Sequence, residues 1–197
     1  MPVRIAEFGA ELLGRYGEVP IAFRVETVFR VEELDGGVGG LGLVEAPLAQ
    51  PYVKDYDALA PGGPANWARR FDVSNWGLFQ AADAGRAVGG AVVAFGCPQV
   101  HMLGGRDDLA LLWDIRVHPA RRDEGIGTAL FRHAADWAAA RGCTQLKIET
   151  QSVNVPACRF YAARGCRLSA IDRHAYTDPR VAHETMLIWM LDLLAGR

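Results

Sequence analysis

The residues whose types and spacing most clearly suggest a binding site are Arg122, Gly125 and Gly127. They lie in a short turn between a predicted strand and a predicted helix. The first N–H groups of a helix have no partner within it, and the helix dipole adds partial positive charge there, so the turn favours an anion. Glycines remove the side chains that would keep a phosphate from those amides, and a pyrophosphate suits the geometry. A left-handed turn and close helix packing explain the same glycines equally well.

A second candidate group, Asn154, Ala157 and Tyr161, belongs to the segment NVPACRFYAARG. Residues at these spacings share one helical face, so an amide, a small residue and a phenol line up in a row. Each also has a purely structural interpretation. Asn154 suits an N-cap, and Tyr161 suits a half-buried packing position with a hydrogen-bonded hydroxyl.

Strands and helices that position these residues follow from hydrophobic periodicity. Period-two or continuous apolar runs predict strands at Ile21–Val31, Trp76–Ala82, Arg86–Phe95, Leu109–Val117, Gln145–Thr150, Cys166–Ile171 and Thr185–Leu191. Apolar residues at three-to-four spacing predict helices from Gly125 to about Arg141 and from Asn154 to Gly165.

Two connecting segments are predicted to be a turn and a loop. The glycine-rich run Asp35–Gly42 lacks a Gly-Lys-Ser/Thr triplet and a following helix, so it predicts a hairpin turn rather than a phosphate loop. Residues Glu45–Phe71 contain four prolines and predict a long irregular loop with a short helix.

The order of elements indicates an α/β chain of the α+β type, with one predominantly antiparallel sheet and helices packed on its faces. A length of 197 residues predicts a single domain. Half the residues are hydrophobic and 22% are charged, which excludes a disordered chain.

Composition also narrows the classes of partner. The net charge of −2 gives no broad basic surface for nucleic acid, and no apolar run reaches the roughly 18 residues of a membrane span. The N-terminal segment lacks a secretory pattern, so a cytoplasmic protein is expected. The four cysteines lack paired CxxC spacing, which argues against a metal site, and reduced thiols are expected.

Together the two candidate segments resemble a known family. The pattern RxxGxG after a strand, then strand LKIET and NxxAxxFYxxxG, resembles the GNAT superfamily of acetyl-CoA-dependent N-acetyltransferases. Within it, KIETQSVNVPACRFYAARG is most similar to the streptothricin acetyltransferase-like group, and the resemblance covers Leu109 to about Leu191. One departure is Cys166, where an aromatic residue commonly follows the helix glycine.

The resemblance implies a GNAT fold, with a mixed, mostly antiparallel central sheet of about seven strands and helices on both faces. Residues 1–108 would supply N-terminal strands and acceptor-side loops, and residues 109–197 the acetyl-CoA-binding core. It further implies roles for individual residues in holding acetyl-CoA. Backbone amides would hold the pyrophosphate at Arg122, Asp123, Glu124, Gly125, Ile126, Gly127 and Thr128.

Other roles implied by the resemblance concern the pantetheine arm and the thioester. Main-chain groups of Ile115, Arg116 and Val117 would pair with pantetheine as an added strand would. Asn154 and Ala157 would line the same arm. Tyr161 would be the general acid, because a phenol with a reference pKa of about 10 keeps its proton at neutral pH.

The acceptor amine must lose a proton before it can attack. An amine with a pKa of about 10.4 is uncharged in about one molecule in 2,500 at pH 7. Asp114 is a candidate base or acceptor anchor, Glu149 is the second candidate base, and water could instead relay the proton. Strand alternation places Asp114 and Arg116 on one side, so these two could simply pair.

Acceptor-binding residues are predicted in the loop that contains Tyr52, Asp55, Tyr56 and Asp57, with Trp76 as a further wall. Aromatic faces mixed with negative charge attract and desolvate a cation, although such residues can also be ordinary solvated surface.

The resulting hypothesis is an enzyme that transfers acetyl from acetyl-CoA directly to a primary amine of a small cationic molecule, such as a streptothricin-like antibiotic or a polyamine-like amine. Antibiotic resistance would follow from the first of these. The alternatives are a protein lysine or N-terminal acetyltransferase and a non-catalytic acyl-CoA-binding regulatory module. No nucleophilic cysteine and no metal are required. The apolar run MLIWML and many alanines are compatible with a homodimer.

Overall fold

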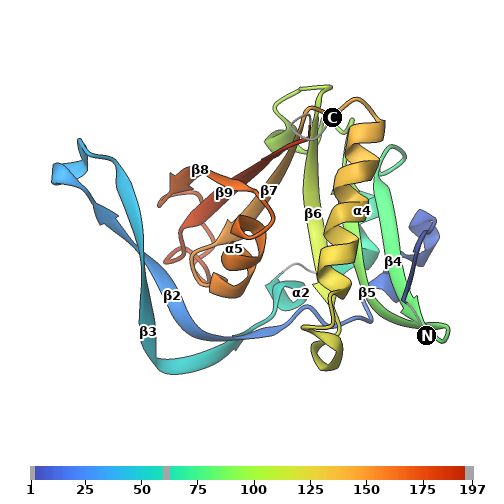
Figure 1. Ribbon diagram of the computed structural model, residues 1–197, viewed down its shortest axis with the longest axis horizontal. Coiled ribbons are helices and arrows are strands. Elements are labelled where there is room, and N and C mark those ends of the chain that lie inside the picture. Colours follow the sequence, from blue (N-terminus) through green and yellow to red (C-terminus); the bar gives the residue numbers. More distant parts are fainter. Residues whose placement is uncertain (1–2, 60–62, 194–197) are drawn as a thin grey trace. The chain divides into compact units, whose positions relative to one another are not determined.

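The computed structural model describes residues 3–59 and 63–193. Within these ranges, seven strands form one sheet in the order β1-β4-β5-β6-β7-β9-β8, and β2 and β3 form a separate two-stranded sheet (Figure 1). The strands are β1 (Arg4–Glu7), β2 (Phe23–Glu33), β3 (Leu41–Lys54), β4 (Gly77–Asp83), β5 (Arg86–Ala94), β6 (Leu109–Val117), β7 (Gln145–Gln151), β8 (Arg167–Asp172) and β9 (Met186–Asp192). The α-helices are α1 (Leu13–Tyr16), α2 (Tyr56–Leu59), α3 (Trp67–Arg70), α4 (Ile126–Ala140) and α5 (Val155–Ala162). Short 3-10 turns are η1 (Ala10–Leu12), η2 (Asp35–Gly37), η3 (Gly63–Asn66), η4 (His101–Leu103) and η5 (Pro119–Arg121).

The predicted fold class, a mixed sheet of seven strands with helices, is confirmed. The strands predicted from Trp76 onward and both long helices are confirmed to within three residues at each end. Gly142 follows the end of α4 with a φ of +82°, which a residue with a side chain rarely adopts. The helix therefore ends where the sequence provides a glycine for the left-handed position.

Contacts divide the chain into two compact units. The first comprises Met1–Phe23, Asp55–Lys147 and Asp192–Arg197, and the second comprises Arg24–Lys54 and Ile148–Leu191. Each unit draws on segments far apart in the sequence, and no boundary between them falls at residue 108. The expectation of a single domain, divided at that residue, stays a prediction.

The first unit is built on β1, β4, β5 and β6, whose neighbours all pair antiparallel. Helix α4 packs across β4, β5 and β6 (Figure 1). The face of α4 toward the sheet is an apolar stripe, which results from the i, i+4 spacing of apolar residues in the sequence. The stripe consists of Ile126, Leu130, Phe131, Ala134, Trp137 and Ala138, all buried.

Two consecutive glycines in β5 show that this sheet is covered on both faces. A side chain at Gly89 would meet Leu130 of α4, whereas a side chain at Gly90 would lie 2.4 Å from Cε2 of Tyr16 in α1. Adjacent strand residues point to opposite faces, so α4 and α1 lie on opposite sides of β5. The absence of a side chain at Gly90 is what lets the Tyr16 ring approach the strand.

The second unit contains the two-stranded sheet of β2 and β3, helix α5, and strands β8 and β9, which pair antiparallel. Helix α5 contacts β8 and buries Val155, Cys158 and Tyr161. In β9, Leu187, Ile188 and Trp189 are buried within the chain. The apolar C-terminal run is therefore used in the core, and the homodimer that it suggested stays a prediction.

The prediction of an irregular loop over Glu45–Phe71 is wrong in its first part. Residues up to Lys54 belong to the 14-residue strand β3, which includes Pro47 and Pro51. Proline has no backbone N–H, and residues four apart in a strand direct this position to the same edge of the strand. Both prolines therefore affect one edge only, and the opposite edge can still pair. A two-stranded sheet has such a free edge, and the prolines therefore did not interrupt the strand.

Sheet membership also differs from the sequence prediction. The strand expected at Ile21–Val31 is present as β2, but it pairs with β3 and not within the seven-stranded sheet. The seventh strand of that sheet is β1, whose four residues pair with β4. Four residues are too few for alternation to stand out from the background, and alternation alone does not determine which sheet a strand joins.

Candidate active site

Strand β6 carries a bulge immediately before its two charged residues. Consecutive residues of β5 pair with Asp114 and Leu112, so Trp113 has no partner on β5. An extra residue of this kind bends the strand and re-aims the side chains that follow. Beyond the bulge the strand alternates regularly, and Asp114 and Arg116 share one face. The prediction that these two residues lie on the same side and pair is confirmed.

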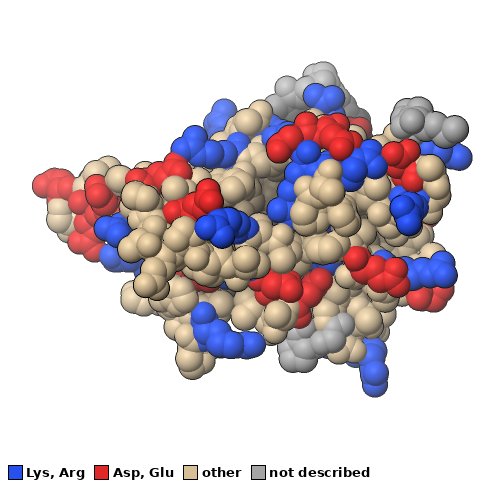
Figure 2. All heavy atoms as spheres, turned by 90° about the horizontal axis from the view of Figure 1, so that it is seen from below, with Lys and Arg blue, Asp and Glu red and all other residues tan. Residues whose placement is uncertain are grey.

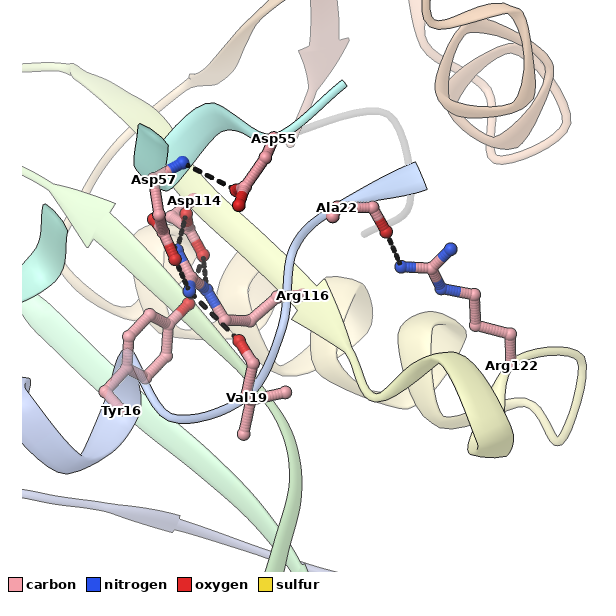
Figure 3. Close-up of polar contacts among 8 residues, drawn as sticks. All are labelled: Tyr16, Val19, Ala22, Asp55, Asp57, Asp114, Arg116 and Arg122. Atoms are coloured by element: carbon pink, nitrogen blue, oxygen red, sulfur yellow. Dashed lines mark hydrogen bonds and ion pairs between the residues drawn. The ribbon is translucent and has the colours of Figure 1, made fainter. Parts of the chain in front are cut away.

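The Arg116 guanidinium is the centre of a buried cluster that joins three segments (Figure 3). Its Nε and Nη2 donate to Asp114 at 2.9 and 2.8 Å. Its Nη1 and Nη2 donate to Asp57 at 2.8 and 3.1 Å, and Nη1 also donates to the backbone oxygen of Val19 at 3.1 Å. These bonds use all five N–H groups of a guanidinium.

The electrostatics of this cluster favour a charged guanidinium. Burial alone would lower the pKa of Arg116, but hydrogen bonds and charge from Asp114, followed by those from Asp57, outweigh burial and raise its pKa. The Arg116 side chain is 0% exposed, whereas the side chains of Asp114 and Asp57 are 7% and 28% exposed. One cation thus holds two carboxylates, and with both ionised the cluster has a formal charge of −1.

Tyr16 is the fourth side chain of the cluster and contacts both Asp114 and Arg116. Its hydroxyl donates to Oδ1 of Asp114, and Arg116 lies over its ring at 4.9 Å from the centroid. Burial, followed by the neighbouring Asp114 charge, raises the pKa of Tyr16 well above its usual value. Sequence reasoning missed this residue. The signal that could have found it is the Gly89-Gly90 pair, since glycine inside a strand often marks a close approach.

The residues predicted to bind an acceptor are partly brought together. Asp57 lies in the first turn of α2, its backbone N–H donates to Oδ1 of Asp55 at 3.0 Å, and its carboxylate accepts from Arg116. Tyr56 packs against Phe23 with ring centroids 5.7 Å apart. Tyr52 lies on β3, in the second unit, and not in the same loop as the other three residues.

Trp76 belongs to an aromatic cluster that surrounds the bulge residue. The Trp113 ring lies 5.0 Å from Phe71, 5.2 Å from Trp76 and 6.1 Å from Trp67, measured between centroids. Trp67 in turn lies 6.0 Å from Tyr16. Because Tyr16 bonds Asp114, the aromatic cluster and the acidic cluster lie on the same side of β6.

The glycine turn before α4 has the donor set that an anion needs. Gly125 adopts φ +80° as the N-cap, gives no side-chain cap to the helix, and has open space where a side chain would project. The neighbouring arginines are engaged elsewhere. Arg121 pairs with Glu124 and Asp83, and Arg122 donates to the backbone oxygen of Ala22 at 2.8 Å (Figure 3). Main-chain amides are therefore the donors that this turn offers.

In the second unit, Asn154 caps α5, and its side-chain oxygen accepts from the Ala157 N–H at 3.2 Å. Its structural interpretation is thereby confirmed. Tyr161 is 5% exposed on the buried face of the same helix. The phenol of Tyr176 donates to Glu149 Oε1 at 2.7 Å, and Gln151 donates to the same oxygen at 3.3 Å. The second candidate base is thus already an acceptor for two groups.

The buried thiol nearest these residues has little nucleophilic character. Burial raises the pKa of Cys158 to about 12, so its thiolate, the reactive form, is scarce at neutral pH. Cys97, Cys143 and Cys166 are likewise free and buried. The low reactivity of Cys158 argues against acyl transfer through a cysteine.

Surface charge is mixed on the face shown in Figure 2, where basic and acidic side chains of the described residues lie next to one another. Ion pairs among the described residues include Arg159–Glu45 and Arg180–Asp178. Over residues 3–59 and 63–193, no group of three or more His, Cys, Asp or Glu side chains is arranged to hold a metal ion. In the same ranges, no helix has the length and apolar character to cross a bilayer.

Comparison with known sequences gives a consistent result. A sequence model of the acetyltransferase (GNAT) family matches residues 48–166. A streptothricin acetyltransferase of Streptomyces lavendulae is 30% identical over 155 residues, which cover 79% of this chain and 76% of that protein. A streptothricin acetyltransferase of Escherichia coli is 39% identical over 84 residues, which cover 42% of this chain and 48% of that protein. The match thus spans about half the length of the E. coli relative.

Solved structures agree in fold. The crystal structure of nourseothricin acetyltransferase superimposes with a TM-score of 0.77 at 25% identity, covering 98% of this chain and 99% of that one. A Bacillus anthracis protein crystallised with acetyl coenzyme A gives a TM-score of 0.76 at 21% identity, covering 97% and 99% of the two chains. The arrangement of elements is therefore shared over nearly the whole length.

Proposed function

The chain belongs to the acetyltransferase (GNAT) family, and on this premise we propose that it transfers acetyl from acetyl-CoA directly to a primary amine of a small cationic molecule. Streptothricin-like antibiotics are the first candidates, because similar proteins are named for them. The observation that carries the proposal is the cluster in which Arg116 holds Asp57 and Asp114 together with a formal charge of −1. A protonated amine complements that charge.

The turn before α4 fits the pyrophosphate of the donor. Its main-chain amides have no side-chain cap, Gly125 leaves space beside them, and the helix dipole favours a negative group. We assign pyrophosphate binding to the backbone of residues 122–128. We assign contact with the pantetheine arm to the main-chain groups of residues 115–117, which would pair with it as an added strand would.

Asp114 serves the acceptor better as an anchor than as a base. A carboxylate has about four lone-pair sites, and Arg116 and Tyr16 together fill three of those on Asp114. One site remains for an N–H of the acceptor. Asp57, with a more exposed side chain, adds charge next to it. Water then takes the proton from the anchored ammonium and passes it to solvent, because protonation of Asp114 would remove the negative charge that pairs with Arg116.

Positioning accounts for most of the catalysis in this proposal. When bound, acetyl-CoA supplies a thioester carbonyl that an uncharged amine nitrogen can attack, with formation of a carbon–nitrogen bond and cleavage of the carbon–sulfur bond. Tyr161 holds the proton that the departing thiolate takes up and regains it from solvent. The anchoring carboxylates fix the amine, which converts a bimolecular encounter into a step between oriented groups.

A thiol-release assay tests the function. The purified chain is incubated with acetyl-CoA and streptothricin, spermidine or a peptide with a free N-terminus, and free thiol is followed by its reaction with a chromogenic disulfide. We expect thiol release with streptothricin and none with the peptide. Expression of the chain in a sensitive bacterium should raise the concentration of streptothricin needed to inhibit growth. Release with peptides alone would identify a protein acetyltransferase. Binding of CoA without release from any amine would identify a non-catalytic module.

A further inference from the structure

We propose that Tyr16 is a positioning residue for amine acetylation, holding the Asp114 carboxylate in the orientation that anchors the acceptor. This inference rests on the proposed function of the same site. Tyr16 lies in α1, 98 residues from Asp114 in the sequence, and its hydroxyl donates to Oδ1 of that carboxylate. It contacts no group that the proposed reaction changes, so its effect passes through Asp114.

The distribution of donors shows what Tyr16 contributes. Oδ1 of Asp114 accepts from both Tyr16 and Nε of Arg116, whereas Oδ2 accepts from Nη2 of Arg116. An oxygen with two donors has its lone pairs filled, and an oxygen with one donor keeps a lone pair. Tyr16 therefore saturates Oδ1 and leaves Oδ2 as the oxygen that can accept from an amine.

The ring of Tyr16 is held so that its hydroxyl has little freedom. Tyr16 is 1% exposed, stacks on Phe8 at 5.7 Å and packs on Trp67 at 6.0 Å. Gly90 provides the space for its edge, and Arg116 covers its face. A buried aromatic ring fixed on several sides directs its hydroxyl to one place.

The hydroxyl remains a donor throughout the working range of pH. Burial and the Asp114 charge raise the pKa of Tyr16 well above its usual value, so ionisation does not compete with donation. A buried phenol would satisfy its hydrogen bond equally well with a backbone carbonyl. In this chain it is directed instead to the carboxylate that the proposed reaction uses.

The test compares Tyr16→Phe with Thr144→Val in the full-length chain. Both variants remove a hydroxyl that donates to an aspartate, because Thr144 Oγ1 donates to Asp108 Oδ2 at 2.7 Å outside the site. With streptothricin as the amine, we expect Tyr16→Phe to lower kcat/KM for the amine by about 10-fold to 100-fold, as expected for a hydrogen bond to a charged group. The KM for acetyl-CoA should stay within twofold. Thr144→Val should leave both parameters within twofold.

A double-mutant cycle separates positioning from general packing. If Tyr16 acts through Asp114, Tyr16→Phe should cause no further loss in an Asp114→Asn background. Asp114→Glu keeps the charge but moves the carboxylate by one methylene, and a positioning role predicts a loss of at least tenfold. This last variant keeps the inference testable if Tyr16→Phe does not fold.

Three results would overturn the inference: losses that multiply in the double mutant, an equal rise in the KM for acetyl-CoA, or native activity of Asp114→Glu. If the wild-type enzyme is active, any one of these results refutes the role of Tyr16 and leaves the proposed function standing. A wild-type chain that releases no thiol with any amine refutes the proposed function and the role of Tyr16 with it.

Discussion

Two buried charge clusters in this chain differ in their balance of charge. In the first unit, one arginine, Arg116, holds two carboxylates, and the Asp57 side chain is 28% exposed. In the second unit, one lysine, Lys54, pairs with one carboxylate, Glu184, and their side chains are only 5% and 2% exposed. A matched and sealed pair has no charge left for a ligand, whereas an unmatched cluster that reaches the surface attracts a cation. Charge balance therefore distinguishes a structural pair from a candidate binding site better than burial does.

The largest expected effect comes from removing the central cation of the unmatched cluster. Arg116→Met should leave two partly buried carboxylates without their partner and lower the free energy of unfolding by about 3–5 kcal/mol. Urea denaturation followed by circular dichroism measures this. Arg116→Lys is the control, and it should recover only part of the loss, because an ammonium cannot reproduce the two bidentate contacts. A loss below about 1 kcal/mol for Arg116→Met would contradict the central role of the guanidinium.

The matched pair should respond differently to single and double substitution. Lys54→Met leaves Glu184 buried without its cation and should cost about 3 kcal/mol of stability. Lys54→Met combined with Glu184→Met should recover most of this loss, because apolar residues of similar volume often replace a buried ion pair without penalty. The double variant should keep kcat/KM for the amine within twofold of the native value. A large activity loss in a folded double variant would break the comparison.

A smaller effect is expected at the exposed member of the unmatched cluster. Asp57→Asn keeps an oxygen acceptor for Arg116 and removes the negative charge, so stability should fall by about 1 kcal/mol. The KM for a cationic amine should rise about fivefold, since partly exposed charges interact weakly, and the KM for acetyl-CoA should not change. Raising the ionic strength should reduce the difference between the two enzymes. An unchanged KM for the amine at low salt would exclude Asp57 from acceptor binding.

The smallest effect concerns the buried thiols, which belong to neither cluster. Burial raises the pKa of Cys158 to about 12. The thiol therefore ionises at a lower pH in the unfolded chain than in the folded chain. Stability from this source is complete below the ordinary thiol pKa and declines as pH rises above it. Unfolding by urea at pH 8 and pH 10 should show the decline, and Cys158→Ala should reduce it. Rapid alkylation of folded protein at pH 8 would contradict the assignment.

Much of the fold could be predicted from local sequence patterns. Strand β6, helix α4 and helix α5 were predicted because continuous apolar runs and three-to-four spacing are properties of short segments. The pairing of Asp114 with Arg116 followed from alternation, since the two residues lie two apart beyond the bulge. Strand β3 was missed because its prolines indicate a loop unless a free strand edge is known to receive them.

The candidate site was less accessible to sequence reasoning. Asp57 was proposed to bind an acceptor, but its bidentate contact with Arg116 joins residues 59 positions apart. Tyr16 was missed entirely, because nothing near it in the sequence marks it as polar and functional. Tyr52, grouped with Asp57 by proximity in the sequence, belongs to the other compact unit. Closeness along the chain was therefore a poor guide to closeness in the site.

The sequence by itself determined the local elements, the uncapped glycine turn before α4 and the family to which the chain belongs, because each depends on residues a few positions apart. Only the tertiary structure decided that α1, α2 and β6 would supply one hydrogen-bonded cluster. Which long-range segments meet depends on how whole faces pack, and a single bulge or a missing side chain, as at Trp113 and Gly90, changes that packing.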